Sequence, residues 1–200
     1  LARVHEVPDL LNLTHANEIR ELQRRYVEAG SDCIATNTFS SNRLKLAGTD
    51  ASVDELYAAA ARIARETGAQ LVAGDIGPTG KLLAPLGPLS FGEAYDIFAE
   101  QARAAHEAGC DLIFLETFAD LPEAKAALLA CVENTPLPVF ATMTFGEDGR
   151  SFMGTTPAIP ATTLSALGAS AVGINCSLGP AETAPLVTQM APYARCPLMV

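Results

Sequence analysis

The chain has 200 residues, which is long enough to bury one sizeable hydrophobic core. It carries 13 basic and 23 acidic residues, a net charge of −10, with no cluster of Lys or Arg, which argues against nucleic acids and anionic membranes as partners. No apolar run approaches the roughly 20 residues of a membrane span, and the amino terminus shows no secretory signal, so we expect a cytoplasmic protein without a membrane partner.

The first half of the chain contains three predicted helices. The first is expected to begin at Thr14 and to end at Gly30, with an apolar stripe at spacings of three and four formed by Ile19, Leu22, Tyr26 and Ala29. The second opens with the capping box Ser52–Glu55 and ends at Gly68. The third opens with the capping box Ser90–Glu93 and ends at Gly109.

Three further helices are expected in the second half, beginning after Asp120, near Ala158 and near Pro180. Short apolar runs between the helices predict strands that begin near positions 33, 71, 111, 138, 171 and 197. Such alternation builds a parallel sheet, because each parallel connection needs a crossover that is usually helical. The strands are continuously apolar, as expected when both faces are buried.

The pattern alone leaves an open doubly wound sheet and a closed barrel as alternatives. No G-x-G-x-x-G follows a strand, which weakens a dinucleotide-binding fold. The segment Gly74–Lys81 resembles a phosphate-binding P-loop only superficially. It has five residues rather than four between its outer glycines, and Leu82 stands where Ser or Thr would bind magnesium.

Polar residues recur where the predicted strands end. The carboxyl ends of parallel strands meet at one edge of a sheet or barrel, so we expect these side chains to converge on one mouth. Asn37 and Asp75 could equally cap turns, whereas Glu116 directly follows a buried strand, where a carboxylate needs a cationic or hydrogen-bonding partner. The candidate binding residues are Asn37, Asp75, Glu116, Thr144 and Asn175.

Five cysteines are spread along the chain without a C-x-x-C pair, which excludes a disulfide framework and a zinc ribbon. Most should be small buried hydrophobic residues. Cys176 differs, because it follows Asn175 at a strand end and precedes a predicted helix, whose amino terminus favours a thiolate. Its position is compatible with a metal ligand, a nucleophile or simple packing. The others are Cys33, Cys110, Cys131 and Cys196.

Several motifs at these positions resemble the homocysteine S-methyltransferase family, in order and over nearly the whole chain. Within that family the similarity is greatest to the homocysteine-binding module of cobalamin-dependent methionine synthases. The motifs are Thr36–Phe39, Gly74–Gly80, Glu116–Phe118, Met143–Phe145, Gly149–Ser151 with Gly154–Thr155, and Gly173–Pro180.

The resemblance implies an α/β fold of the (β/α)₈ TIM-barrel type and transfer of a methyl group to the thiol of homocysteine, forming methionine. The family binds zinc through three cysteine thiolates, one of which would be Cys176. Glu116 would hold the substrate ammonium, and Asn37, Asp75, Thr144 and Asn175 would line the same mouth; no residue is assigned to catalysis itself. Zinc deprotonates a bound thiol. The methyl group would come from methylcobalamin on another domain of a parent protein that also binds folate.

The chain departs from the family at both ends. The family opens with an Asp-Gly-rich first strand, and two further zinc cysteines lie adjacent near the end of its barrel; neither feature is present between Leu1 and Val200. Only six strands are predicted, and a barrel needs eight. We therefore expect residues 1–200 to be a single homocysteine-binding barrel domain, truncated at both ends, without its first and last strands and inactive on its own.

Three alternatives stay open. The first is a stand-alone homocysteine methyltransferase that uses S-methylmethionine or betaine as donor. The second is a non-catalytic barrel that binds an amino acid. The third is an unrelated barrel lyase with Glu116 as base, which would need a Lys or His at a strand end, whereas His5, His15 and His106 are expected in the leader or on helices.

Overall fold

The computed structural model describes residues 7–200. Six strands in this range form one parallel sheet: β1 (Cys33–Ala35), β2 (Leu71–Ile76), β3 (Leu112–Phe118), β4 (Val139–Met143), β5 (Ala171–Ile174) and β6 (Leu198–Met199). The helices are η1 (Pro8–Leu10), α1 (Leu11–Thr14), α2 (Ala16–Glu28), α3 (Val53–Glu66), α4 (Phe91–Glu107), α5 (Leu121–Asn134), α6 (Ala158–Ala166), α7 (Pro180–Met190) and η2 (Ala191–Tyr193).

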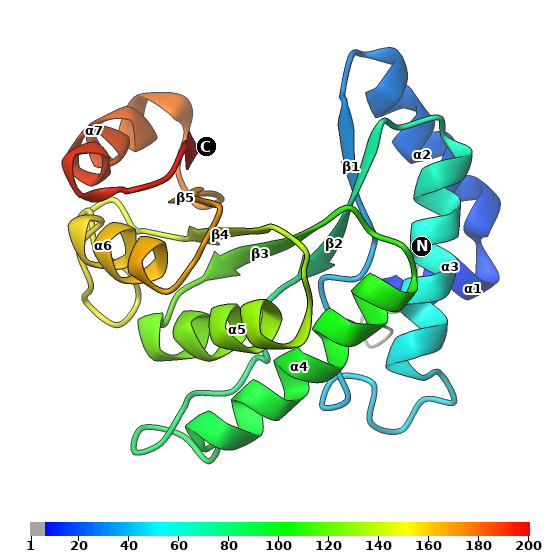
Figure 1. Ribbon diagram of the computed structural model, residues 1–200, viewed down its shortest axis with the longest axis horizontal. Coiled ribbons are helices and arrows are strands. Elements are labelled where there is room, and N and C mark those ends of the chain that lie inside the picture. Colours follow the sequence, from blue (N-terminus) through cyan, green and yellow to red (C-terminus); the bar gives the residue numbers. More distant parts are fainter. Residues whose placement is uncertain (1–6) are drawn as a thin grey trace.

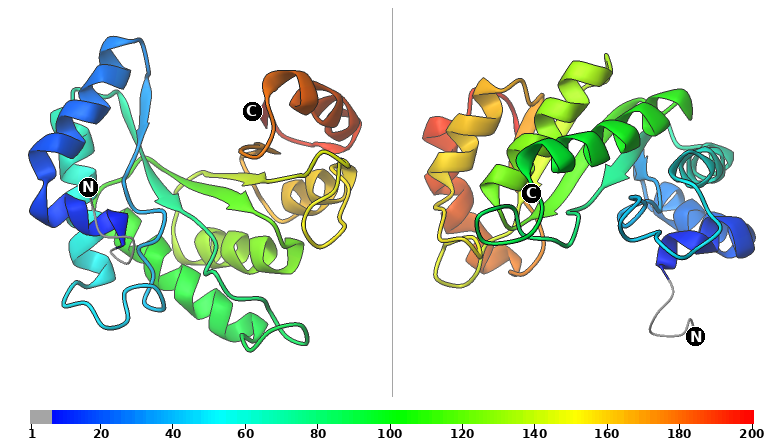
Figure 2. Two further views of the ribbon diagram at one scale, coloured as in Figure 1. Left: turned by 180° about the vertical axis from the view of Figure 1, so that it is seen from behind. Right: turned by 90° about the horizontal axis from the view of Figure 1, so that it is seen from below.

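The sheet is curled, and its strands follow one another in chain order from β1 to β6 (Figure 1). The helices cover the convex face, and the two edge strands β1 and β6 lie at opposite ends of the curve (Figures 1 and 2). A doubly wound sheet has helices on both faces and a reversal in strand order. The structure therefore excludes that alternative and confirms the prediction of an incomplete (β/α)₈ barrel. No helix within residues 7–200 is long and apolar enough to cross a bilayer.

The hydrophobic core lies between the convex face of the sheet and the helices. Phe98 of α4 and Phe118 of β3 are fully buried there, with ring centroids 5.8 Å apart. Gly74 also faces this layer, because a Cβ built on it would lie 2.7 Å from Cβ of Ala105 in α4. Successive side chains of a strand alternate between faces, so Asp75 points to the concave side.

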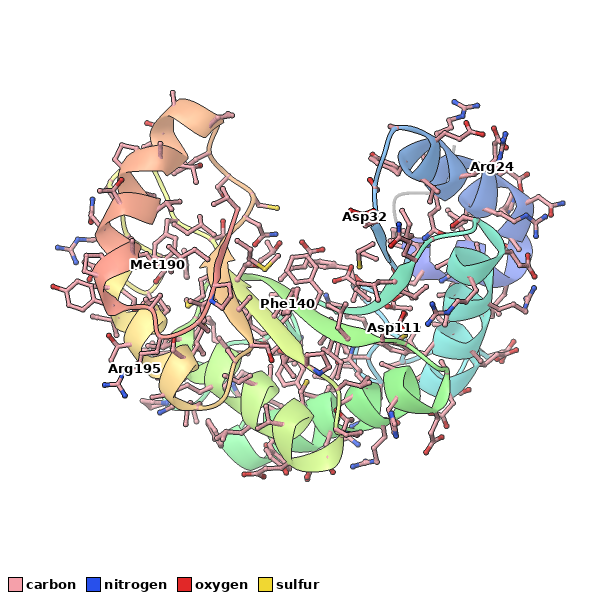
Figure 3. The ribbon with its side chains drawn as sticks, turned by 45° about the horizontal axis from the view of Figure 1, so that its top comes forward. Arg24, Asp32, Asp111, Phe140, Met190 and Arg195 are labelled. Carbon is pink, nitrogen blue, oxygen red and sulfur yellow. The ribbon has the colours of Figure 1, made fainter. Side chains whose placement is uncertain are left out.

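The concave face of the sheet carries both apolar and polar layers of side chains. Asp75 of β2 is in register with Phe114 of β3, which is in turn in register with Phe140 of β4. Phe140 lies between the two arms of the curved sheet (Figure 3). The next inward positions toward the carboxyl ends are Glu116 and Thr142, so polar groups follow the aromatic layer at the mouth.

Both predicted capping boxes begin a helix where expected. The Ser52 side chain accepts a hydrogen bond from the Glu55 backbone N–H at 3.1 Å. At Ser90 both halves of the box form, since the Glu93 carboxylate also accepts the Ser90 backbone N–H at 2.9 Å. Helix α5 begins directly after Asp120 as predicted, although that side chain makes no capping hydrogen bond.

The prediction of a first helix beginning at Thr14 is wrong. Thr14 is the last residue of α1, its hydroxyl donates back to the Leu10 carbonyl, and α2 starts at Ala16. The predicted apolar stripe also does not face the core, because Leu22 is 53% exposed and Tyr26 is 59% exposed. Both lie over the β1 edge, where no further strand pairs within the part of the chain that the structure describes.

Candidate functional site

The candidate site is a set of polar side chains at the carboxyl end of the curved sheet. Asp75 and Glu116 lie inside β2 and β3, since both strands continue beyond the apolar runs that predicted them. Asn175 follows β5 directly, and Thr142 belongs to β4. Adjacent parallel strands thereby bring these four residues together from distant parts of the chain.

Asn175 connects three strands through its side-chain amide. Its Nδ2 donates to Glu116 Oε2 at 2.7 Å and to Thr117 Oγ1 at 2.8 Å. Its Oδ1 accepts from Thr142 Oγ1 at 2.8 Å and from the Thr117 backbone N–H at 2.9 Å. The amide therefore holds the Glu116 carboxylate, the end of β3 and the end of β4 in one hydrogen-bonded unit.

Three residues around this unit have left-handed backbone conformations. The φ angles are +62° at Thr117, +61° at Cys176 and +62° at Ser177. Non-glycine residues rarely adopt this region, and a β-branched residue such as threonine does so at particular cost. At Thr117 the pairing of β3 with β4 also shifts register, as in a β-bulge. Asn175 offsets the strain by accepting a hydrogen bond from the Thr117 backbone N–H and donating one to the Thr117 hydroxyl.

Cys176 is exposed beside this unit. Its Sγ lies 3.4 Å from Thr117 Oγ1 and 3.5 Å from Asn175 Nδ2. The thiol also borders a hollow of about 600 Å³ between the end of β5 and α7. Glu116 and Asp75 do not line that hollow, so it lies beside the carboxyl groups rather than around them.

Asp75 is the most deeply buried carboxyl group of the site, with 6% of its surface exposed. Its backbone N–H donates to Thr36 Oγ1 at 3.0 Å, and its carbonyl accepts from Thr38 and Tyr57 hydroxyls, both at 2.8 Å. Its Oδ1 has no hydrogen-bond partner among residues 7–200. Burial, and then the neighbouring charge of Glu116, raise the pKa of Asp75 well above its usual range.

The other two predicted binding residues lie outside the Asn175 unit. Asn37 follows β1, and its Nδ2 donates to the Pro8 carbonyl at 3.3 Å, so this amide holds the amino-terminal helix η1. Thr144 lies at the mouth beyond β4, where its hydroxyl is 2.8 Å from that of Ser177. Asn37 therefore has a structural contact that accounts for it, whereas Thr144 borders Cys176 through Ser177.

The sequence places Thr117 and Thr142 among the polar residues at strand ends but assigns neither of them a role. The structure shows that both complete the contacts of Asn175. His106 lies within α4 as expected, whereas His15 lies between α1 and α2 rather than on a helix, and His5 lies outside the described residues.

The expectation that most cysteines are buried is wrong. Cys110 and Cys131 are buried, and burial raises the pKa of Cys110 to about 12. Cys33 is exposed, because it lies at the β1 edge on the same face as Ala35, and Cys196 is half-buried ahead of β6. The exposed thiol at the mouth is therefore that of Cys176, whereas Cys33 lies at the opposite, amino-terminal end of its strand.

A zinc site does not fit the described residues by themselves. Residues 7–200 contain no group of three or more His, Cys, Asp and Glu side chains that could hold a metal ion. Cys176 offers one exposed thiol beside hydrogen-bond donors, and a structural zinc shell takes four ligands. Any zinc held here needs ligands from outside these residues.

Comparison with known proteins gives a consistent result. The chain is 32% identical over 207 residues to methionine synthase of Mycobacterium tuberculosis and 30% identical to that of Mycobacterium leprae, in both cases over 96% of this chain. It spans only 17% of the length of these two relatives.

Solved structures show the same fold. The metallated form of the homocysteine methyltransferase MmuM from Escherichia coli superposes with a TM-score of 0.81 at 20% identity, covering 100% of this chain and 77% of that one. Its apo form gives 0.80 at 21% identity, covering 96% and 73%. The sequence model described as homocysteine S-methyltransferase matches residues 3–200. The chain therefore belongs to the homocysteine S-methyltransferase family.

Proposed function

We propose that this chain is the homocysteine-binding part of a methyltransferase that methylates the thiol of homocysteine to give methionine. One observation carries the proposal: Asn175 joins the Glu116 carboxylate and the Cys176 thiol at a single mouth. Homocysteine has an ammonium group at one end and a thiol at the other. A carboxylate next to a potential metal ligand matches both ends of that molecule, and membership of the family supports the assignment.

Glu116 would bind the substrate ammonium. Its Oε2 already accepts from Asn175, so the carboxylate is held in one orientation before substrate arrives. A preoriented carboxylate loses little entropy on binding and forms a charge-assisted hydrogen bond. Thr144 and Ser177, whose hydroxyls are 2.8 Å apart, would offer polar contacts at the same rim.

Cys176 would provide one of three thiolate ligands to zinc, with the other two supplied by residues outside this chain in a longer protein. Bound zinc would keep the homocysteine sulfur deprotonated at neutral pH. Thr117 and Asn175 would orient the Cys176 thiolate through the contacts at 3.4 and 3.5 Å. The described residues bind and orient the substrate, and no side chain among them is assigned to proton transfer.

The methyl donor would be methylcobalamin carried on another domain, next to a folate-binding domain. The supporting observation is that the chain spans 17% of two methionine synthases, which leaves most of those proteins for other domains. Homocysteine and these domains would be its partners, in the cytoplasm. Activity of the longer protein with methylcobalamin, compared with S-methylmethionine and betaine, tests the choice of donor.

The test of the metal role compares Cys176→Ala with Cys33→Ala in a longer protein that supplies the other thiolates. Both cysteines are exposed, but only Cys176 lies at the mouth. We expect Cys176→Ala to lose bound zinc, measured by atomic emission after dialysis, while Cys33→Ala retains it. Glu116→Gln should keep zinc and weaken homocysteine binding by about tenfold or more, because a charged hydrogen bond is lost. Undiminished zinc in Cys176→Ala would refute the assignment.

A further inference from the structure

Two carboxyl groups lie on neighbouring strands inside the candidate site, and neither pairs with a basic side chain among residues 7–200. Asp75 and Glu116 lie on adjacent parallel strands, and Asp75 is in register with Phe114, two positions before Glu116 on the same face of the sheet. Burial, the charge of Glu116 and a side-chain hydrogen bond with Glu116 all raise the pKa of Asp75. Asp9 adds a further acidic group near Asp75, and Lys45, the neighbouring base, faces Asp9 and Glu123 instead.

The remaining groups packed against Asp75 are neutral. Thr36 and Thr38 contact its backbone from the segment after β1, and Tyr57 contacts its carbonyl from α3. Burial raises the pKa of Tyr57 well above its usual range, so its hydroxyl stays protonated and donates. No group in this shell neutralises a second negative charge.

A deeply buried carboxyl group and a half-buried one beside it cannot both ionise at small cost, so one of the two holds a proton. The contacts distinguish the two groups. Glu116 Oε2 accepts a hydrogen bond from the Asn175 amide. Asp75 is 6% exposed and its Oδ1 has no hydrogen-bond partner among residues 7–200, and the Ile76 backbone hydrogen bond lowers its pKa less than burial and Glu116 raise it. The proton therefore belongs on Asp75.

We propose that Asp75 is protonated at neutral pH and donates a hydrogen bond to Glu116, so that the pair carries one negative charge and Glu116 is fixed from both sides. Asn175 then holds one side of Glu116 and Asp75 the other. In the proposed function, on which this step rests, the single charge of the pair matches the single ammonium group of the substrate. Asp75 acts as a positioning residue and keeps its proton when substrate binds.

The first experiment uses the chain alone and needs neither zinc nor substrate. Infrared spectra of wild type and Asp75→Asn at pH 7 should differ by the band of one protonated carboxyl group. Above about pH 4 the unfolded wild-type chain releases a proton from Asp75 that the folded chain keeps. The ratio of the unfolding constant of wild type to that of Asp75→Asn should therefore rise with pH. The increase should be up to about tenfold per pH unit, until Asp75 of the folded chain ionises.

Asp120→Asn is the matched control, because Asp120 lies at the same end of the barrel and has no contact with Glu116. Like Asp75 it is largely buried, and burial raises its pKa, so Asp120→Asn should have a pH slope of its own but leave the protonated-carboxyl band of Asp75 in place. Absence of that band from wild type, together with a pH-independent ratio of unfolding constants for Asp75→Asn, would overturn the proposal.

The second experiment measures homocysteine binding in the longer protein with its complete zinc site. Asp75→Asn should bind within about threefold of wild type, since an amide N–H replaces the carboxyl O–H as donor. Asp75→Ala should bind about tenfold more weakly, since Glu116 loses its second partner. Equal losses in both variants would contradict a protonated Asp75. Normal infrared results with no effect on binding in either variant would instead count against Glu116 as the ammonium site.

Discussion

At the scale of single residues, the mouth depends on one amide. Asn175 makes four side-chain hydrogen bonds at 2.7 to 2.9 Å to three residues of two neighbouring strands. Its donors and acceptors are fully used, so replacing it removes a hydrogen-bond partner from Glu116, Thr117 and Thr142, which are half-buried or buried. It also supports the left-handed backbone at Thr117.

Asn175→Ala should lower the free energy of unfolding by about 2–4 kcal/mol, because several partners lose their hydrogen bonds together. Asn175→Asp should be worse at pH 7, since it places a carboxylate against Glu116. Urea denaturation at pH 7 measures both. Asn134→Ala is the control: Asn134 also makes several side-chain hydrogen bonds, but near the solvent-facing end of α5, and we expect a smaller loss. A larger loss for Asn134→Ala would contradict this account.

The cysteines illustrate why residue type alone does not decide a role. Cys131 lies within α5, where complete burial raises its pKa strongly, and it has the character of a small hydrophobic residue. Cys176 has the same thiol in an exposed, left-handed position beside two hydrogen-bonding side chains. Its surroundings, rather than its sequence spacing, distinguish it.

At the scale of elements, local sequence controls where the helices begin. The Ser90 box satisfies two backbone N–H groups of α4, those of Ser90 and Glu93, whereas Ser52 satisfies that of Glu55 in α3. These contacts join residues three apart in the chain and need no tertiary partner.

Ser90→Ala should therefore cost about 1–2 kcal/mol of unfolding free energy, and Ser52→Ala about 0.5–1 kcal/mol. The larger loss is expected at Ser90 because the Glu93 carboxylate also accepts hydrogen bonds from the backbone N–H and the hydroxyl of Ser90. These contacts depend on the geometry that Ser90 imposes. Urea denaturation of both variants under one set of conditions gives the comparison. A larger loss of unfolding free energy for Ser52→Ala than for Ser90→Ala would show that the capping box at Ser90 adds no stability.

At the scale of the whole molecule, the curved sheet assembles the site from the ends of four strands. Side chains at the ends of β2, β3, β4 and β5 converge because parallel strands present their carboxyl ends on one side. At this mouth, residues 7–200 supply one thiol, that of Cys176, to the proposed metal site.

A polypeptide of residues 1–200 should accordingly bind no stoichiometric zinc and methylate no homocysteine. One thiolate cannot form the closed shell on which tight zinc binding depends. Zinc content after dialysis and a methionine-formation assay measure both properties, with the longer protein as the positive control. Tight zinc at one equivalent in the 200-residue polypeptide would contradict the prediction.

Much of the fold followed from local pattern. Capping boxes, helix-ending glycines and continuous apolar runs identified the helices and strands, because these signals act between residues a few positions apart. The family motifs identified Glu116 and Cys176 as neighbours of a common site. The sequence did less well at α2, where Leu22 and Tyr26 formed an apolar stripe that the sheet edge leaves half exposed.

The sequence by itself determined the order of elements, the parallel sheet and the family, since each rests on short-range periodicity or on motifs read in chain order. Tertiary structure alone decided that Asn175 binds Glu116 across 59 positions, that Asn37 holds the amino-terminal helix, and that Asp75 is buried beside the strand that carries Glu116. The physical reason is that hydrogen bonds and carboxyl pairs act over a few ångströms, and only the curvature and register of the sheet bring such distant residues within that range.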